Sequence, residues 1–149
     1  MNTLAMYNRL TKLPLGNKIF SKAVCLAAPY FSSIKPKISE LKPGLCQVQM
    51  KKRRRVQNHM KTVHAIAMCN MAELSAGLMM DVSVPKGARW IPAGMEVQYL
   101  KKAKTHLVAV ADGQDIDWKT QGDVMVPVRV TDTQDNLVFS AQVRMNIKH

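Results

Sequence analysis

Acidic residues are scarce in the first third of this 149-residue chain. Residues 1–55 contain twelve Lys and Arg but a single acid, Glu40, which gives a net charge of +11, whereas residues 56–149 carry ten basic and nine acidic residues, a net charge of +1. Such asymmetry indicates a negatively charged partner, such as nucleic acid, an anionic membrane or a phosphorylated ligand. We expect that partner to contact the N-terminal third.

Other features are also missing. The three cysteines, Cys25, Cys46 and Cys69, are an odd number separated by 21 and 23 residues, which fits neither a disulfide framework nor a zinc ligand set. There is no His-Glu-x-x-His, Cys-x-x-Cys or phosphate-loop motif, so we expect no metal and no other cofactor. No apolar run approaches the roughly 20 residues of a membrane-spanning helix. We therefore expect one globular, cytoplasmic domain with reduced thiols.

The hydrophobic periodicity predicts both helices and strands. Helical spacing is present over residues 3–13 and 19–27, and Pro14 and Gly16 separate these two short helices. Residues 62–80 contain no proline, are rich in Ala, Met and Leu, and predict a helix that is buried on most sides. Alternating patterns predict six strands, over residues 34–42, 45–54, 91–101, 105–112, 122–132 and 137–147.

This order of elements predicts an α+β domain, in which a curved antiparallel sheet wraps around one long central helix. We expect an N-terminal helical segment over residues 1–33 and the sheet domain over residues 34–149. A six-stranded open sheet leaves an edge strand that a second copy of the chain would cover. We therefore expect a homodimer, or else a tetramer.

Glu73 is the only carboxylate within residues 62–80, and a charge in an apolar helix needs a partner or a function. Asn58, His59 and His64 precede or open the same helix, whose free N–H groups can bind an oxyanion. His64 and Glu73 are nine residues apart, about 2.5 turns and about 13.5 Å, so they lie on opposite faces of one helix. If both belong to one site, that site must combine two subunits.

Residues 58–65 read Asn-His-Met-Lys-Thr-Val-His-Ala, and Glu73 follows nine residues after the His. This spacing resembles the hotdog-fold thioesterases of the phenylacetate-pathway type, in particular an uncharacterised thioesterase-like branch of that superfamily. The segment Tyr-Leu-Lys-Lys-Ala at residues 99–103 is similar to the family's Tyr-Leu-Arg-Pro-Ala strand. Lys61 stands where the family has Gly, and Ala65 and Ile66 stand where it has Gly-Gly.

The resemblance implies a hotdog fold and a site that acts on an acyl thioester. Its catalytic residues would be Asn58, His64 and Glu73, with His64 mainly shaping the start of the helix. A backbone N–H near Ala65 would polarise the thioester carbonyl, and Glu73 of the partner chain would act as general base or nucleophile. Ala65 and Ile66 would contact the substrate, as would Lys101 and Lys102.

A basic run, Lys-Lys-Arg-Arg-Arg at residues 51–55, immediately precedes the candidate site. It is typical of a solvated strand end, of a nucleic-acid contact, of a nuclear import signal or of a site for the phosphates of coenzyme A. No aromatic residue alternates with these cations, so base stacking lacks its usual partner. We expect Arg53, Arg54 and Arg55 to bind the phosphates of an acyl-coenzyme A.

Three functional hypotheses remain at this point. The first is an acyl-coenzyme A thioesterase whose site lies at a dimer interface. The second is a hotdog protein that binds acyl thioesters or lipids without hydrolysing them, because the family's glycines are replaced. The third, and least favoured, is a basic nucleic-acid-binding or membrane-surface protein in which Glu73 is structural.

Overall fold

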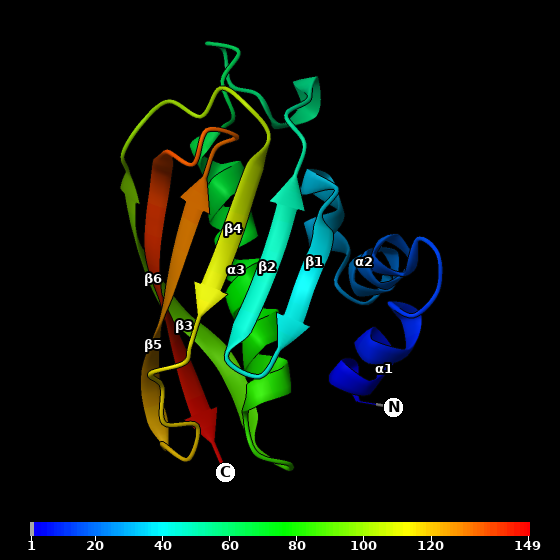
Figure 1. Ribbon diagram of the computed structural model, residues 1–149. Helices are drawn as coiled ribbons and strands as arrows, with labels where there is room; N and C mark the ends of the chain where they lie inside the picture. The colour runs from blue at the N-terminus through cyan, green and yellow to red at the C-terminus, as the bar shows by residue number, and fades with distance from the viewer. Residues whose placement is uncertain (1) are drawn as a thin grey trace.

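The computed structural model describes residues 2–149 and shows three helices, two short 3-10 helices and six strands (Figure 1). In chain order they are α1 (Thr3–Leu10), α2 (Gly16–Ala27), η1 (Pro29–Ile34), β1 (Lys37–Lys42), β2 (Leu45–Met50), η2 (Arg54–Val56), α3 (Ala65–Ser83), β3 (Arg89–Tyr99), β4 (Leu107–Asp112), β5 (Gly122–Thr131) and β6 (Leu137–Lys148).

All six strands form one antiparallel sheet in the order β1-β2-β4-β5-β6-β3. Pro43 and Gly44 make the turn between β1 and β2, and Gly44 has a positive φ of 79°, which glycine adopts without a steric penalty. Buried residues alternate with less buried ones along β4 and β5, so one face of the sheet forms the core. The predicted antiparallel α+β architecture is confirmed.

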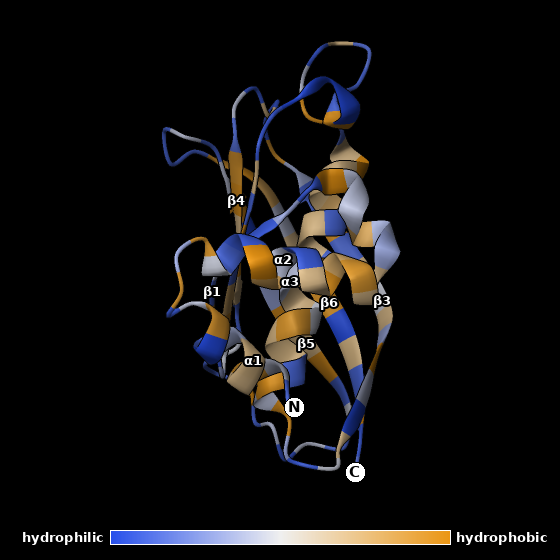
Figure 2. Cartoon of the chain, turned by 90° about the vertical axis from the view of Figure 1, so that its right-hand side faces the viewer, coloured by the Kyte–Doolittle hydropathy of each residue, from blue (hydrophilic) through white to orange (hydrophobic). Residues whose placement is uncertain are grey.

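Helix α3 packs against one face of this sheet and contacts all six strands. Seen from the side of α1 and α2, β1 and β4 lie on one side of α3 and β3 lies on the other (Figure 2). By length and composition alone α3 could cross a membrane, but half of it is buried, as expected for the core helix of a domain. It ends at Ser83, before Val84 and Pro85, because the residue preceding a proline disfavours the helical conformation.

The N-terminal segment packs against the edge of the sheet at β1. Tyr7 of α1 and Phe20 of α2 meet edge to face, with 5.1 Å between ring centroids. Gly16 is required where α2 begins, because a Cβ there would lie 1.9 Å from the carbonyl oxygen of Leu10. The segment is therefore part of the same core as the sheet.

The predicted elements exist, but several boundaries were wrong. The strand expected from residue 34 begins at Lys37, because residues 29–34 form η1, and the strand expected to reach residue 54 ends at Met50. The helix expected over residues 62–80 runs from Ala65 to Ser83, because Thr62 belongs to a hydrogen-bonded turn that precedes it. A periodic pattern gives the type of an element more reliably than its ends.

Candidate functional site

A tight turn over residues 58–62 leads into α3. The Asn58 side chain closes it, since its Oδ1 accepts hydrogen bonds from the N–H groups of Met60 at 3.0 Å and Thr62 at 3.1 Å. Lys61 has a left-handed backbone, with a φ of 60°. Glycine adopts this conformation more readily than lysine does. In this chain Asn58 shapes the turn that precedes the helix.

His64 caps the N-terminus of α3. Its Nδ1 accepts a hydrogen bond from the Ile66 N–H at 3.0 Å, and its carbonyl oxygen accepts from the N–H groups of Ala67 and Met68. Within residues 2–149, no acceptor binds the N–H of Ala65, the first residue of the helix. The start of α3 therefore presents one free N–H group at the positive end of the helix dipole.

Neighbouring segments hold this helix start in place. The Val63 N–H donates to the carbonyl oxygen of Ala103, and the His64 N–H donates to that of Val56, both at 2.8 Å. Ala103 is buried and ends the segment that begins at Tyr99. The two predicted sequence motifs, residues 58–65 and 99–103, thus meet in space.

A cavity of about 330 Å³ lies beside the helix start. Its walls include Arg55 from η2, Ser33 from η1, and Ile66 and Asn70 from α3. We call it the first cavity. The Ile66 side chain is 55% exposed, so it stands at this cavity without packing into the core.

Glu73 is exposed and lines a second cavity, of about 430 Å³, farther along α3. Most residues that line this second cavity are apolar: Met6, Ala23, Val24, Ala27, Ala28, Phe31, Leu74, Gly77, Leu78, Trp90 and Pro92, together with Thr3, Glu73 and Asp81. Gly77 lets Trp90 approach α3, because a Cβ at Gly77 would lie 3.1 Å from the indole ring. A mostly apolar cavity with two carboxylates in its wall suits a ligand with an uncharged hydrocarbon part.

Glu73 and His64 line different cavities of the same chain. This separation agrees with their spacing along α3, about 2.5 helical turns. Cys69 lies one turn before Glu73, and its Sγ is 3.8 Å from the hydroxyl oxygen of Tyr99 in β3. The hydrogen bond with Cys69 raises the pKa of Tyr99.

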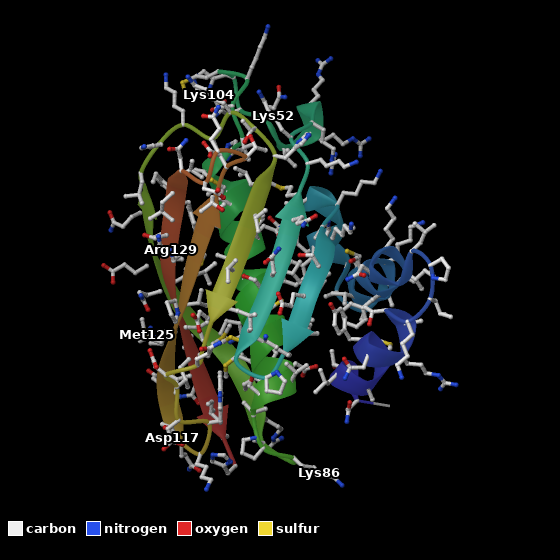
Figure 3. All side chains as sticks on the ribbon, viewed as in Figure 1. Lys52, Lys86, Lys104, Asp117, Met125 and Arg129 are labelled. Carbon is white, nitrogen blue, oxygen red and sulfur yellow. The ribbon has the colours of Figure 1, made fainter. Side chains whose placement is uncertain are left out.

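The predicted cationic residues lie at the end of the sheet where α3 begins. Figure 3 shows Lys52 and Lys104 at this end, and Lys86 and Asp117 at the opposite end. Arg55 lines the first cavity, while the Arg53 guanidinium donates to the carbonyl oxygen of Ser33 at 2.8 Å. Arg54 is exposed and lies outside both cavities. The basic run therefore follows the end of β2 as a loop with a 3-10 turn, and it is not part of the strand predicted over residues 45–54.

Lys101 and Lys102 are exposed and follow β3. Neither residue lines the first or the second cavity. The structure thus brings together Arg55, His64 and Ile66 of the predicted residues, and leaves these two lysines on the surface outside the cavities. Within residues 2–149, no group of three His, Cys, Asp or Glu side chains is placed to hold a metal ion.

Sequence reasoning missed two polar residues of the first cavity, Ser33 and Asn70. The Asn70 Nδ2 donates to Ser33 Oγ at 3.2 Å, and its Oδ1 is buried without a partner among the described residues. Asn70 is one of the few polar residues of the largely apolar α3, which is a signal that the sequence does contain. Asn70 and Ser33 are 37 positions apart, so no local sequence pattern indicates their contact.

Comparisons with known proteins agree with this fold. A structural-genomics protein, APC5556, has 46% sequence identity over 98% of this chain and 97% of its own, with a TM-score of 0.89. PA5026 of Pseudomonas aeruginosa, described as a protein of unknown function and probable thioesterase, has 17% identity over 91% and 96% of the two chains and a TM-score of 0.76. The thioesterase HI1161 of Haemophilus influenzae has 12% identity over 80% and 82%, with a TM-score of 0.72. Among curated proteins, none matches.

At these low identities, HI1161 and PA5026 show the fold alone, which is the hotdog fold. The narrower resemblance to the phenylacetate-pathway type is not shown. A family model described as a domain of unknown function, DUF4442, matches residues 16–147 and so includes α2 and the whole sheet except the last residue of β6. The chain is a hotdog-fold member of the DUF4442 family.

Proposed function

We propose that this protein hydrolyses acyl thioesters of coenzyme A at a site shared by two subunits of a homodimer. The observation that carries the proposal is a free Ala65 N–H at the start of α3, combined with an exposed carboxylate, Glu73, in an apolar cavity on the same helix. An N–H group can stabilise an oxyanion and a carboxylate can move a proton, and thioester hydrolysis needs both. The thioesterase neighbours of the fold support this class of reaction.

The two groups act on one substrate only if they come from different subunits. Eight residues separate Ala65 from Glu73, about 12 Å of helix rise, which is too far for one carbonyl group. Two α3 helices that face each other antiparallel across a two-fold axis would bring Ala65 of one subunit beside Glu73 of the other. Each complete site then combines the first cavity of one subunit with the second cavity of its partner.

The chemistry follows from these groups. Glu73 takes a proton from a water molecule, whose oxygen attacks the thioester carbonyl carbon while the Ala65 N–H binds the developing oxyanion. The C–S bond then breaks, the carbonyl re-forms, and the proton on Glu73 passes to the leaving thiolate. The products are a carboxylic acid and free coenzyme A. The acyl chain occupies the second cavity, and Arg55 holds a phosphate beside the first.

A second candidate function, binding without hydrolysis, is favoured by Ile66. Its exposed side chain occupies a position where the family pattern has glycine and stands at the first cavity. A bulky residue there would hold the carbonyl away from the Ala65 N–H. Binding of acyl-coenzyme A without turnover by the wild-type protein would establish this alternative.

The test is a hydrolysis screen over acyl-coenzyme A substrates of increasing chain length, with Glu73→Gln beside the wild type. We expect Glu73→Gln to lower kcat by roughly 10²–10⁴-fold, the usual contribution of a general acid–base group. Asp81→Asn is the matched control, because Asp81 lies on the same helix and lines the same cavity. Wild-type turnover by Glu73→Gln on every substrate would refute the assigned role.

Ala65→Pro tests the oxyanion site separately. Proline is favoured at the first position of a helix and lacks an N–H, so the substitution removes the proposed donor while preserving the helix. We expect an unchanged melting temperature and a loss of roughly 10²–10³ in kcat, the effect of removing one oxyanion donor. Full activity in Ala65→Pro would exclude that N–H as the oxyanion donor.

A further inference from the structure

Helix α2 exposes an apolar stripe on its outer face, made of Leu15, Ile19 and Leu26, which are 69%, 46% and 82% exposed. Ile19 and Leu26 are seven residues apart, so they lie within about 20° of each other around the helix axis, and Leu15 immediately precedes the helix. The inner side of α2 is already packed, since Phe20 is fully buried. Helices α1 and α2 form the outermost layer on this side of the molecule (Figure 2). The stripe is therefore a second apolar face of α2, which no part of residues 2–149 covers.

The backbone of Leu15 indicates that the fold does not require a leucine there. Its φ is 59°, which is a left-handed conformation that leucine rarely adopts and that asparagine or glycine adopts at lower cost. The exposed Leu15 side chain also gains little from packing within the chain. A leucine at a position that disfavours it indicates a role outside the folding of the single subunit.

Lysines border the stripe, and acids are absent from this segment. Lys18 and Lys22 are four residues apart on α2, and both are exposed beside the apolar side chains. Residues 2–39 contain six basic residues, all of them exposed, and no Asp or Glu. The first acid is Glu40, and its carboxylate pairs with Lys42 at 3.2 Å. The outer face of α2 is thus apolar and cationic at once.

This combination favours an anionic lipid bilayer over other partners. Leucine side chains gain by entering hydrocarbon, while lysines beside them contact negatively charged lipid headgroups. A nucleic acid would bind the lysines through its phosphates but would offer the leucines no hydrocarbon. A second copy of the chain would bring the same lysines face to face across a two-fold axis, where like charges repel.

We propose that the outer face of α2 docks on an anionic membrane surface, with the stripe inserted among the lipid chains and the two bordering lysines at the headgroups. This inference does not rest on the proposed hydrolysis. The inner side of the same helix lines the second cavity through Ala23, Val24 and Ala27. Docking therefore places that cavity about one helix diameter, roughly 10 Å, from the bilayer.

The experiment measures binding of the full chain to phosphatidylcholine vesicles that contain about one third phosphatidylglycerol, by sedimentation with the vesicles. We expect the wild type to bind these vesicles at least tenfold more tightly than vesicles of phosphatidylcholine alone. Leu15→Asn combined with Leu26→Gln should weaken binding roughly 100-fold, because both leucines lose the gain of leaving water. Met125→Gln is the matched control, since Met125 is 46% exposed and lies on the other side of the molecule from α2 (Figures 1 and 3).

Lys18→Gln combined with Lys22→Gln tests the cationic part. We expect a loss of about 25-fold on the anionic vesicles, because each basic residue near such a surface contributes about fivefold. Lys86→Gln combined with Lys119→Gln, at exposed positions outside the N-terminal third, is the control. A loss in the α2 lysine variant with full binding in the leucine variant would overturn the inference. Tighter binding to an oligonucleotide than to the vesicles would overturn it in favour of nucleic acid.

The melting temperature separates docking from folding. Leu15→Asn alone relieves the left-handed leucine, so its melting temperature should equal or exceed that of the wild type while vesicle binding falls about tenfold. A lower melting temperature or unchanged vesicle binding in this variant would overturn the inference, as would a wild-type protein that does not bind the anionic vesicles. Weaker self-association of Leu26→Gln in sedimentation equilibrium would assign the face to a second copy of the chain instead.

Discussion

The two edges of the sheet are built in opposite ways. At the β1 edge, α2 satisfies the strand's backbone: Asn17 Nδ2 donates to the carbonyl oxygen of Ile38 at 2.9 Å, and the Ile38 N–H donates to Ser21 Oγ at 2.8 Å. At the other edge, β3 pairs with β6 on its inner side and has no strand on its outer side within residues 2–149. Its apolar residues are also exposed, Ile91 at 63% and Tyr99 at 56%.

An open strand edge with exposed apolar side chains is a surface on which another chain can pair. The β1 edge is not available for such pairing, because α2 covers it. The difference supports a dimer that forms through β3. Trp90 and Pro92 of β3 also line the second cavity, so the open edge adjoins the candidate site.

Charge on the open edge should break the dimer. We expect Ile91→Lys combined with Met95→Lys to raise the dimer dissociation constant by roughly 100-fold or more, because an unpaired charge is poorly tolerated in an interface. Both residues are exposed in the single chain, so the subunit should remain folded. Sedimentation equilibrium measures the effect.

The matched control places lysines on the covered side. Ile19 and Leu26 of α2 are 46% and 82% exposed, and the Ile19→Lys and Leu26→Lys double variant should leave the association unchanged. A wild-type protein that is monomeric at all concentrations would contradict the proposed role of the open edge. So would an unaltered dissociation constant in the β3 variant.

The covering helix α2 should also limit the length of the acyl chain. Ala27 lines the second cavity, so Ala27→Trp should displace about three methylene groups of a long chain, at about 0.8 kcal/mol each. We expect kcat/KM to fall roughly 50-fold for dodecanoyl-coenzyme A and to change little for butanoyl-coenzyme A. Leu26→Trp, one residue away on the exposed side, is the control. Equal losses on both substrates would mean that the chain does not occupy this cavity.

Opening the covered edge should have the smallest effect. Asn17→Ala leaves the carbonyl oxygen of Ile38 without its side-chain donor, and we expect the free energy of unfolding to fall by about 1–2 kcal/mol in urea titrations. Asn8→Ala, at an exposed position of α1, serves as the control. If the two variants lose equal stability, α2 does not protect the edge through Asn17.

The sequence predicted the elements better than the contacts between them. Periodicity identifies the long helix and the six strands, because each buries one face against a common core. Proline cannot donate a hydrogen bond to a neighbouring strand, so Pro127 predicts a sheet edge or a bulge at its position. Pro127 lies in β5, just beyond Val128, whose pairing with Ala111 is the last one between β5 and β4. On the β4 side, β5 is therefore unpaired at Pro127, although β5 is an internal strand of the sheet.

The candidate site was predicted only in part, for a physical reason. Helix geometry alone separates His64 from Glu73, and the structure places them in different cavities. The pairing of Asn70 with Ser33 and the cover that α2 provides are contacts between segments distant in sequence. The left-handed backbone of Lys61 was also unpredictable, because lysine rarely adopts it.

The shared site is tested most directly by mixing two inactive variants. Glu73→Gln lacks the carboxylate and Ala65→Pro lacks the N–H donor, and each homodimer should be inactive. After subunit exchange about half of the dimers are mixed, and each mixed dimer contains one intact site of its two. The account predicts that activity returns to about one quarter of the wild-type value. If subunits exchange but no activity returns, Ala65 and Glu73 do not act across the interface.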